Sequence, residues 1–416
     1  MEANHSAGEG PAVDSAASDR LAIRQTIGYF AAFIGLGLTA ASLGPTLTGL
    51  AEHTGSDLAQ ISYLFSARSL GYLLGSLRGG RLFDRLPGHP LQAVMLVGMI
   101  VTMALVPLSS LLWVVTGLLF ILGLAEGALD IGGNILLVWV HQRRVGPYMN
   151  ALHFFFGIGA FLSPIIAAQA LLRTNDINWV YWLLAIYLVP VALWLIRLPS
   201  PKVPSAVQSH QRKIAYPVLV GLIVVYFSLY VGAEVSFGGW IFTYATTLEL
   251  ANPTTAAYLT SIFWGVFTIG RLVGIPLSSR IKPHNLLAAD LAGCLLSMLV
   301  ILLFPGSLPA LAIGTAGLGL SMASMFPNML VYAELRMPLS GLVTSWFFVG
   351  VGAGAMILPW LIGQLFERVG PWIVMWAILI DLAACALVFT AIRLYHRRPP
   401  LSESEPIANP APYSGD

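Results

Sequence analysis

Apolar stretches recur along the whole chain, and each is long enough (about 20 residues) to cross the roughly 30 Å hydrocarbon core of a membrane as a helix. Twelve such stretches occur, over residues 25–50, 58–80, 91–110, 112–140, 148–172, 178–197, 215–244, 254–278, 285–304, 308–334, 340–366 and 371–394. Only 10% of the residues are charged, whereas soluble domains carry about 25%. The sequence therefore predicts an all-α membrane protein of twelve transmembrane helices.

One polar connector, residues 199–214, divides these spans into two sets of six. Residues of the first half recur with the same identity 195 positions later: Gly75, Gly79, Arg85 and His89 match Gly270, Gly274, Arg280 and His284. Such a parallel repeat is typical of transporters that open one central site alternately to each side. We expect two pseudo-symmetric six-helix bundles, residues 25–198 and 215–395, with disordered cytoplasmic tails at 1–24 and 396–416.

Positive residues are unevenly distributed between the two sides of the predicted membrane. One set of loops, together with both tails, holds nearly all of them: Arg20, Arg24, Arg78, Arg81, Arg85, Arg143, Arg144, Arg197, Lys202, Arg212, Lys213, Arg280, Lys282, Arg336, Arg393, Arg397 and Arg398. The alternate loops hold only Arg173 and Arg368. By the positive-inside rule both termini are predicted to be cytoplasmic. The compact loops favour a multi-pass protein of a plasma or bacterial inner membrane.

A short motif, Gly80-Arg-Leu-Phe-Asp84-Arg85, lies between the second and third spans. It resembles the G-x-L-x-D-R-x-G signature of the major facilitator superfamily, with Pro87 displacing the closing glycine to Gly88. Signature, repeat and span count together identify the chain as similar to this superfamily. The resemblance implies the major facilitator fold.

Further segments look like the branch of that superfamily that contains sodium-dependent glucose transporters: Arg68-Ser-Leu-Gly-Tyr72, Leu129-Asp-Ile-Gly-Gly-Asn134 and Pro147-Tyr-Met-Asn-Ala-Leu-His153. The second segment resembles, more distantly, an acid-plus-asparagine motif of fucose–proton symporters. These resemblances imply a sugar carried with a cation. Fucose symporters also place an acid in their first span, which this chain lacks, so their complete coupling scheme does not carry over.

The fourth span presents Glu126, Asp130 and Asn134 four residues apart, on one stripe of a helix. An ionisable group in hydrocarbon costs roughly 2.5–3.5 kcal/mol, so intramembrane acids are usually functional. We hypothesise that Asp130 is the coupling acid, with Glu126 as a second candidate, and that Asn134 binds a substrate hydroxyl. The alternative is a structural ion pair, with Arg68 of the second span as the partner.

Other polar residues inside spans are candidates for substrate binding: His153, Tyr226, Tyr230, Glu234 and Asn328. Sugars need aromatic faces for their C–H surfaces and amides or carboxylates for their hydroxyls. Packing of the histidine and membrane-interface positions for the aromatic residues are the alternatives.

A conformational role is predicted for Arg68, as a gating or structural pair, and for Asp84 and Arg85, as part of a cytoplasmic latch. We expect the glycines of the second span (Gly71, Gly75 and Gly79) to serve close helix packing. The sequence contains no Walker loop, metal-ligand cluster or nucleophile–base pair, which argues against an enzyme.

The sequence as a whole predicts a secondary active transporter that couples a sugar or similar polar solute to Na⁺ or H⁺ by alternating access. The alternatives are a proton-coupled exporter of drugs or metabolites and a transporter-like receptor. We expect a monomer in the lipid bilayer, with no nucleic acid partner and no cofactor beyond the coupling ion.

Overall fold

A computed structural model describes residues 11–201, 216–337 and 339–395, and the regular structure within these ranges is entirely helical. Its elements are α1 (Pro11–Ala40), α2 (Leu43–Thr54), α3 (Leu58–Ile61), α4 (Tyr63–Phe83), α5 (Gly88–Leu105), η1 (Val106–Leu108), α6 (Leu112–His141), η2 (Gln142–Arg144), α7 (Val145–Thr174), α8 (Asn178–Ile196), α9 (Pro217–Thr247), α10 (Pro253–Ser278), α11 (Pro283–Leu303), α12 (Leu308–Met322), α13 (Met325–Glu334), α14 (Gly341–Val369) and α15 (Ile373–Tyr395).

Each of the twelve predicted spans corresponds to one helix or to consecutive helices of this series. Eleven spans within the described residues are long and apolar enough to cross a membrane. Helix α4 occupies the remaining span; it is less apolar because it carries Arg68, Arg78 and Arg81. The twelve-helix prediction is confirmed.

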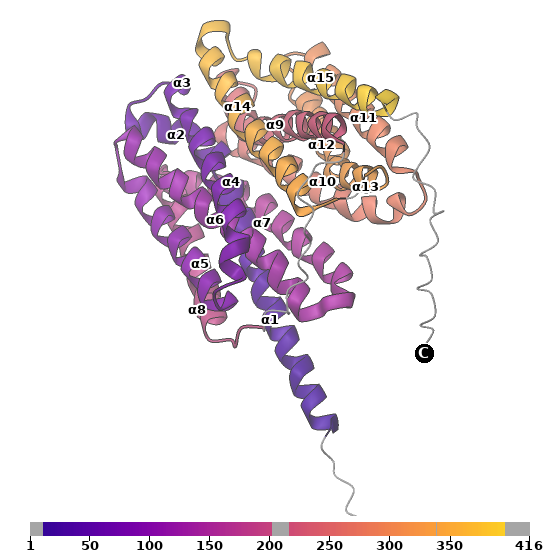
Figure 1. The fold of residues 1–416 in the computed structure, drawn as a ribbon. Helices are drawn as coiled ribbons and strands as arrows, with labels where there is room; N and C mark the ends of the chain where they lie inside the picture. The colour runs from indigo at the N-terminus through magenta and orange to yellow at the C-terminus, as the bar shows by residue number, and fades with distance from the viewer. Residues whose placement is uncertain (1–10, 202–215, 338, 396–416) are drawn as a thin grey trace, which may run out of the picture.

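The ends of the chain differ in part from the sequence prediction. Helix α1 begins at Pro11, so residues 11–24, predicted as disordered tail, are helical, and α1 projects beyond the rest of its bundle (Figure 1). The predicted tail 396–416 and most of the predicted linker lie outside the described residues.

The helices form two bundles, α1–α8 and α9–α15, which Figure 1 shows in indigo to magenta and in red to yellow. The same pairs of helices pack in each: α4 on α6 corresponds to α10 on α12, α1 on α7 to α9 on α14, and α5 on α8 to α11 on α15. The bundles meet along α7 with α10 and α4 with α14, again a symmetric pair. The repeat in the sequence is therefore a repeat in the packing.

The two bundles are joined by hydrogen bonds at the end of the molecule opposite to the one where α1 begins, which we call the far end. The side chain of Gln364 donates to the Ala59 carbonyl at 2.7 Å, and the Leu58 amide donates to Glu367 at 3.0 Å. Deeper along the same seam, the Ser69 hydroxyl donates to the Ala355 carbonyl at 3.1 Å. Beyond Ser69, toward the end where the termini lie, no hydrogen bond between side chains or backbone of the two bundles occurs among the described residues.

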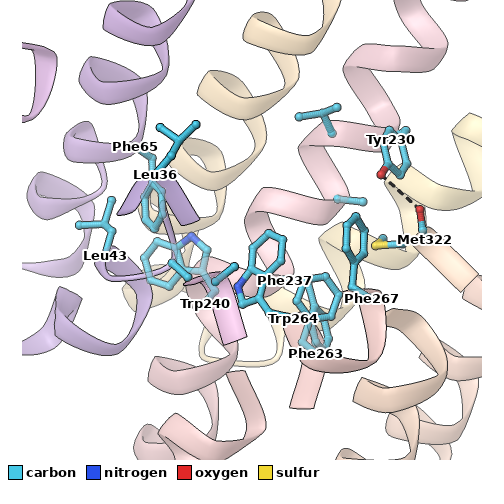
Figure 2. Packing of buried hydrophobic residues seen from close by; sticks show 14 of the residues in the cluster. Leu36, Leu43, Phe65, Tyr230, Phe237, Trp240, Phe263, Trp264, Phe267 and Met322 are labelled. Carbon is cyan, nitrogen blue, oxygen red and sulfur yellow. Dashed lines mark hydrogen bonds between the residues drawn. The ribbon is translucent and has the colours of Figure 1, made fainter. Parts of the chain in front are cut away.

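Aromatic packing strengthens the far-end contact. Phe65 of α4 packs on Trp240 of α9, with ring centroids 5.9 Å apart (Figure 2). Trp240 is fully buried, stacks on Phe366 at 5.4 Å and donates its indole N–H to the Pro359 carbonyl at 3.1 Å. These hydrogen bonds and ring contacts between the bundles lie at the far end, so the conformation is closed there.

Candidate functional site

Glycine pairs bring α4 and α6 into backbone contact. A Cβ on Gly71 of α4 would lie 2.1 Å from the Phe120 carbonyl oxygen, and a Cβ on Gly123 of α6 would lie 2.0 Å from the Arg68 carbonyl oxygen. No larger residue fits such positions, and small residues at helix interfaces are how membrane helices approach closely. The prediction of close packing at Gly71 is confirmed. The close approach also sets the polar side chains of α4 directly opposite the acidic stripe of α6.

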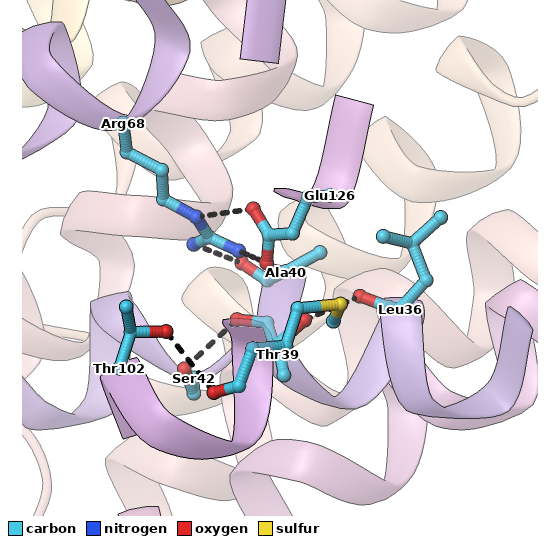
Figure 3. A network of polar contacts seen from close by, with 8 residues as sticks. Leu36, Thr39, Ala40, Ser42, Arg68, Thr102 and Glu126 are labelled. Atoms are coloured by element: carbon cyan, nitrogen blue, oxygen red, sulfur yellow. Dashed lines mark hydrogen bonds and ion pairs between the residues drawn. The ribbon is translucent and has the colours of Figure 1, made fainter. Parts of the chain in front are cut away.

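The first polar contact across this interface is a bidentate ion pair. Arg68 donates from Nε to Glu126 Oε2 at 2.9 Å and from Nη2 to Oε1 at 2.6 Å (Figure 3). Its Nη1 donates to the carbonyl of Ala40, the last residue of α1, at 3.1 Å. The Glu126 side chain is only 3% exposed. Glu126 was predicted either to help couple the cation or to form a structural ion pair with Arg68, and the structure supports the ion pair.

The second contact, one helical turn further on, holds Asp130. The hydroxyl of Tyr72 donates to its Oδ2. The amide nitrogen of Asn134 donates to its Oδ1 at 3.0 Å and to its backbone carbonyl at 2.9 Å. Asp130 is thus oriented by neutral donors from its own bundle, while the amide oxygen of Asn134 is left for another partner.

Arg271, on α10 of the second bundle, is a cation that acts on this acid. It interacts electrostatically with four ionisable side chains: Asp130, His153, Tyr230 and Glu234. Its guanidinium lies 4.7 Å from the centroid of the Phe267 ring, and its Nε is buried without a hydrogen-bond partner. Arg271 was not among the predicted site residues, although it lies in the predicted span 254–278. A charged residue inside a membrane span is costly and usually functional, and this applies to an arginine as much as to an acid.

Several predicted site residues meet around Arg271. Glu234 and Tyr230 lie one turn apart on α9 and interact with each other, and the Tyr230 hydroxyl donates to the Met322 carbonyl at 3.2 Å (Figure 2). His153 of α7 packs edge-on against Phe33, with centroids 6.0 Å apart. Asp130, Asn134, His153, Tyr230 and Glu234 therefore form one group at the junction of the bundles, which we call the junction site.

Two predicted substrate residues lie elsewhere. Tyr226 is fully buried and packs against Phe389 of α15, with centroids 6.4 Å apart. Asn328 is 4% exposed and lies beside Asp290 of α11. Both positions are inside the second bundle, away from Arg271, so a role for them in substrate binding stays a prediction.

The residues predicted as a latch, Asp84 and Arg85, are exposed at the end of α4. Their side chains make no hydrogen bond or ion pair with the described parts of the chain. The latch prediction is therefore untested.

Two six-helix bundles related by an internal repeat, with charged side chains buried where they meet, define a helical membrane transporter of the alternating-access type. The chain belongs to the major facilitator superfamily, whose family model, described as Major Facilitator Superfamily, matches residues 26–340. Members of this superfamily are transporters and not enzymes.

Three relatives indicate which members of the superfamily the chain resembles. The chain is 34% identical to sodium-dependent glucose transporter 1 of Xenopus laevis over 355 residues, covering 78% of this chain and 72% of the relative. It is 32% identical to sodium-dependent glucose transporter 1 of Homo sapiens, covering 80% and 72%. It is also 27% identical to the human major facilitator superfamily domain-containing protein 4A, covering 84% and 88%.

Solved structures share the fold at low sequence identity. The nucleoside transporter NupG, as its D323A mutant, superposes with a TM-score of 0.73 at 15% identity, covering 91% of this chain and 100% of that chain. A D-xylose-proton symporter gives a TM-score of 0.66 at 13% identity, covering 88% and 97%.

Proposed function

We propose that the protein is a secondary active transporter that carries a sugar, or a similar small polar solute, together with Na⁺ or H⁺. The observation that carries this proposal is the junction site: Asp130 from one bundle and Glu234 from the other both interact with Arg271. Opposed charges on two bundles that rock against each other give a site whose electrostatics change with conformation. Relatives named sodium-dependent glucose transporter 1 support the choice of substrate and ion.

The formal charge of the junction site favours coupling to a monovalent cation. Glu126 and Arg68 neutralise each other in their ion pair. In their ionised forms Asp130 and Glu234 carry two negative charges and Arg271 one positive charge, which leaves one net negative charge. A single Na⁺ or H⁺ balances that charge, so a neutral solute can then cross with it. We assign the coupling ion to Asp130 because the negative charge of Glu126 is already neutralised by Arg68.

The substrate is proposed to sit among the polar groups of the junction site. The amide oxygen of Asn134 can accept from a hydroxyl, and His153 and Glu234 offer further hydrogen-bonding groups from opposite bundles. Aromatic rings at the closed far end, with Trp240 and Phe65 in contact, would bound the site on that side. These are the two features that recognition of a sugar requires.

The orientation predicted from Arg and Lys makes the terminal end cytoplasmic, so the conformation seen here would be inward-facing. Outward opening would then require the far-end seam at Gln364 and Trp240 to separate. The terminal ends, including Asp84 and Arg85, would close in the same step. We place the protein in a plasma or inner membrane with both termini in the cytoplasm.

The test is uptake of radiolabelled hexoses into proteoliposomes that hold the purified protein, with a Na⁺ gradient, a proton gradient or neither imposed. Accumulation above the external concentration under one gradient, and equilibration without it, is the expected result and identifies the ion. Absence of hexose uptake under every condition would reject the sugar proposal and favour the exporter alternative.

A further inference from the structure

The tenth predicted span is interrupted in the structure. Helix α12 ends at Met322 and α13 begins at Met325, whereas α6, the corresponding helix of the first bundle, is continuous from Leu112 to His141. Main-chain groups freed by a break at membrane depth need other partners. The Met322 carbonyl is one of them, and it accepts from the Tyr230 hydroxyl at 3.2 Å.

A carboxylate reaches this break from α11. Asp290 Oδ2 accepts a hydrogen bond of 2.5 Å from the hydroxyl of Ser324, one of the two residues between the helices. Ser324 and Asn328 stand 194 positions after Asp130 and Asn134, so they repeat the polar stripe of α6 in the second bundle. The break therefore gathers an acid, a hydroxyl and an amide from two elements.

Further buried polar atoms face Asp290 and have no hydrogen-bond partner. The side chain of Asn328 interacts with the Asp290 carboxylate, is 4% exposed, and leaves Nδ2 unpartnered. Tyr226 of α9 also interacts electrostatically with Asp290, is fully buried, and leaves its hydroxyl unpartnered. A polar group that is buried without a partner needs an explanation, and a bound water or ion is one of them.

The charge of Asp290 is not balanced by the protein. Within the described residues no Lys, Arg or His lies within salt-bridge distance of it. Glu126 forms an ion pair with Arg68 and Arg271 acts electrostatically on Asp130, whereas no cation is among the groups that act on Asp290. An isolated charge in a membrane span costs roughly 2.5–3.5 kcal/mol, and a bound cation removes that cost.

We propose that Asp290, Ser324 and Tyr226 form a second cation site, for Na⁺, at the break between α12 and α13. The ligands are the carboxylate of Asp290 and the hydroxyl oxygens of Ser324 and Tyr226, which are oxygen ligands of the kind that a hard cation takes. The Asn328 amide group orients the carboxylate. The negative end of the α12 dipole adds to the attraction, as at the discontinuous helices of other transporters. One carboxylate selects a monovalent ion.

Two contacts connect this site to the junction site. A Cβ on Gly270 of α10 would lie 2.7 Å from the Ala323 Cβ, so α10 packs tightly on the break one residue away from Arg271. Tyr230 contacts the break at Met322 and also interacts with Glu234. Occupation of the second site would thus order the helix that supports the junction site. The proposal concerns ion binding alone and holds whichever ion and solute the junction site carries.

The test is equilibrium binding of ²²Na⁺ to the purified full-length protein in detergent, without substrate and at fixed pH. Asp290→Asn and Ser324→Ala are each made in an Asp130→Asn background and compared with Asp130→Asn alone. Asp381→Asn is the matched control, since Asp381 is another acid within a span of the same bundle with an unpartnered oxygen. The Asp130→Asn background separates the second site from the junction site.

In an Asp130→Asn background, which removes the proposed cation ligand of the junction site, we expect Asp290→Asn to weaken the remaining Na⁺ binding at least about tenfold, Ser324→Ala to weaken it less, and Asp381→Asn to leave it unchanged. If Asp290→Asn does not fold, as judged by gel filtration, Ser324→Ala carries the test. Unchanged Na⁺ affinity in both Asp290→Asn and Ser324→Ala would overturn the proposal. So would the absence of Na⁺ binding to the wild type, or the loss of all Na⁺ binding in Asp130→Asn.

Discussion

Replacement of Glu126 by glutamine should leave the guanidinium of Arg68 buried without its counter-charge. In the wild type Arg68 makes hydrogen bonds of 2.9 and 2.6 Å to Glu126 and one of 3.1 Å to the Ala40 carbonyl. Glutamine keeps one acceptor oxygen but turns an NH₂ group toward the guanidinium, which loses both the second hydrogen bond and the ionic attraction. The side chains of Arg68 and Glu126 are 12% and 3% exposed, so water replaces little of this. Removing one partner of a buried pair costs about 3–5 kcal/mol.

A double variant separates the pair from its individual charges. Arg68→Met with Glu126→Leu removes both charges and keeps apolar volume, so it should lie within about 2 kcal/mol of the wild type, including the Ala40 carbonyl left without a donor. The assay is reversible unfolding in mixed detergent micelles, with the free energy of unfolding compared across variants. Asp19→Asn, at an exposed position of α1, is the control for loss of an acid.

Two results would refute this reasoning. One is a Glu126→Gln variant whose free energy of unfolding lies within about 1 kcal/mol of the wild-type value, since a buried guanidinium without its counter-charge should destabilise the fold by more than that. The other is a double variant as unstable as the single one. Transport adds a third criterion: the double variant should still accumulate solute under the cation gradient. Loss of gradient-driven accumulation there, with Asp130 intact, would make Glu126 a coupling group as well.

Three further substitutions test the geometry. Tyr72→Phe removes a hydrogen bond to the Asp130 carboxylate and should change the half-saturating cation concentration about tenfold in uptake assays, with unchanged yield of folded protein. Gly71→Val should sharply reduce the yield on gel filtration, because its Cβ would meet an α6 carbonyl at 2.1 Å; a normal yield would contradict the close packing. Cysteines at Ser62 and Gln364, whose side chains are joined by a 3.2 Å hydrogen bond from Gln364 Nε2 to Ser62 Oγ, should be linked by a short bifunctional thiosulfonate reagent, and the link should stop uptake until it is reduced; uptake by the linked protein would contradict opening at the far end.

Much of the fold could be predicted because the signals are local. Each span is a run of apolar residues whose length the bilayer sets, and the repeat appears directly as matching residues 195 positions apart. The interruption has a signal in the sequence, because Pro327 has no amide hydrogen to donate to the Ala323 carbonyl four residues earlier and its ring clashes with that carbonyl. The position of the interruption within that turn could not be predicted. It depends on contacts with Asp290 and Tyr230, which come from other helices.

The candidate site was predictable only where its residues share one helix. Glu126, Asp130 and Asn134 stand on one stripe of α6 by their spacing alone. Their partners come from a second helix, and the register that sets Tyr72 against Asp130 depends on glycine contacts such as that at Gly123.

The stripe of α9 shows the limit of the spacing argument. Tyr226, Tyr230 and Glu234 have the same spacing as the α6 stripe. Along this 31-residue helix, however, the neighbour changes from Phe389 of α15 at Tyr226 to Arg271 of α10 at Glu234. Spacing indicates a shared face, but crossing helices decide what each part of that face contacts.

The proposed function depends above all on Asp130, which we propose couples solute movement to a cation. The most direct measurement compares two modes of transport by Asp130→Asn in proteoliposomes: accumulation driven by the coupling gradient, and exchange of labelled for unlabelled solute at equal concentrations. We expect accumulation to be abolished and exchange to remain, because the solute contacts at Asn134 and Glu234 survive the substitution. Full gradient-driven accumulation by Asp130→Asn would contradict the account.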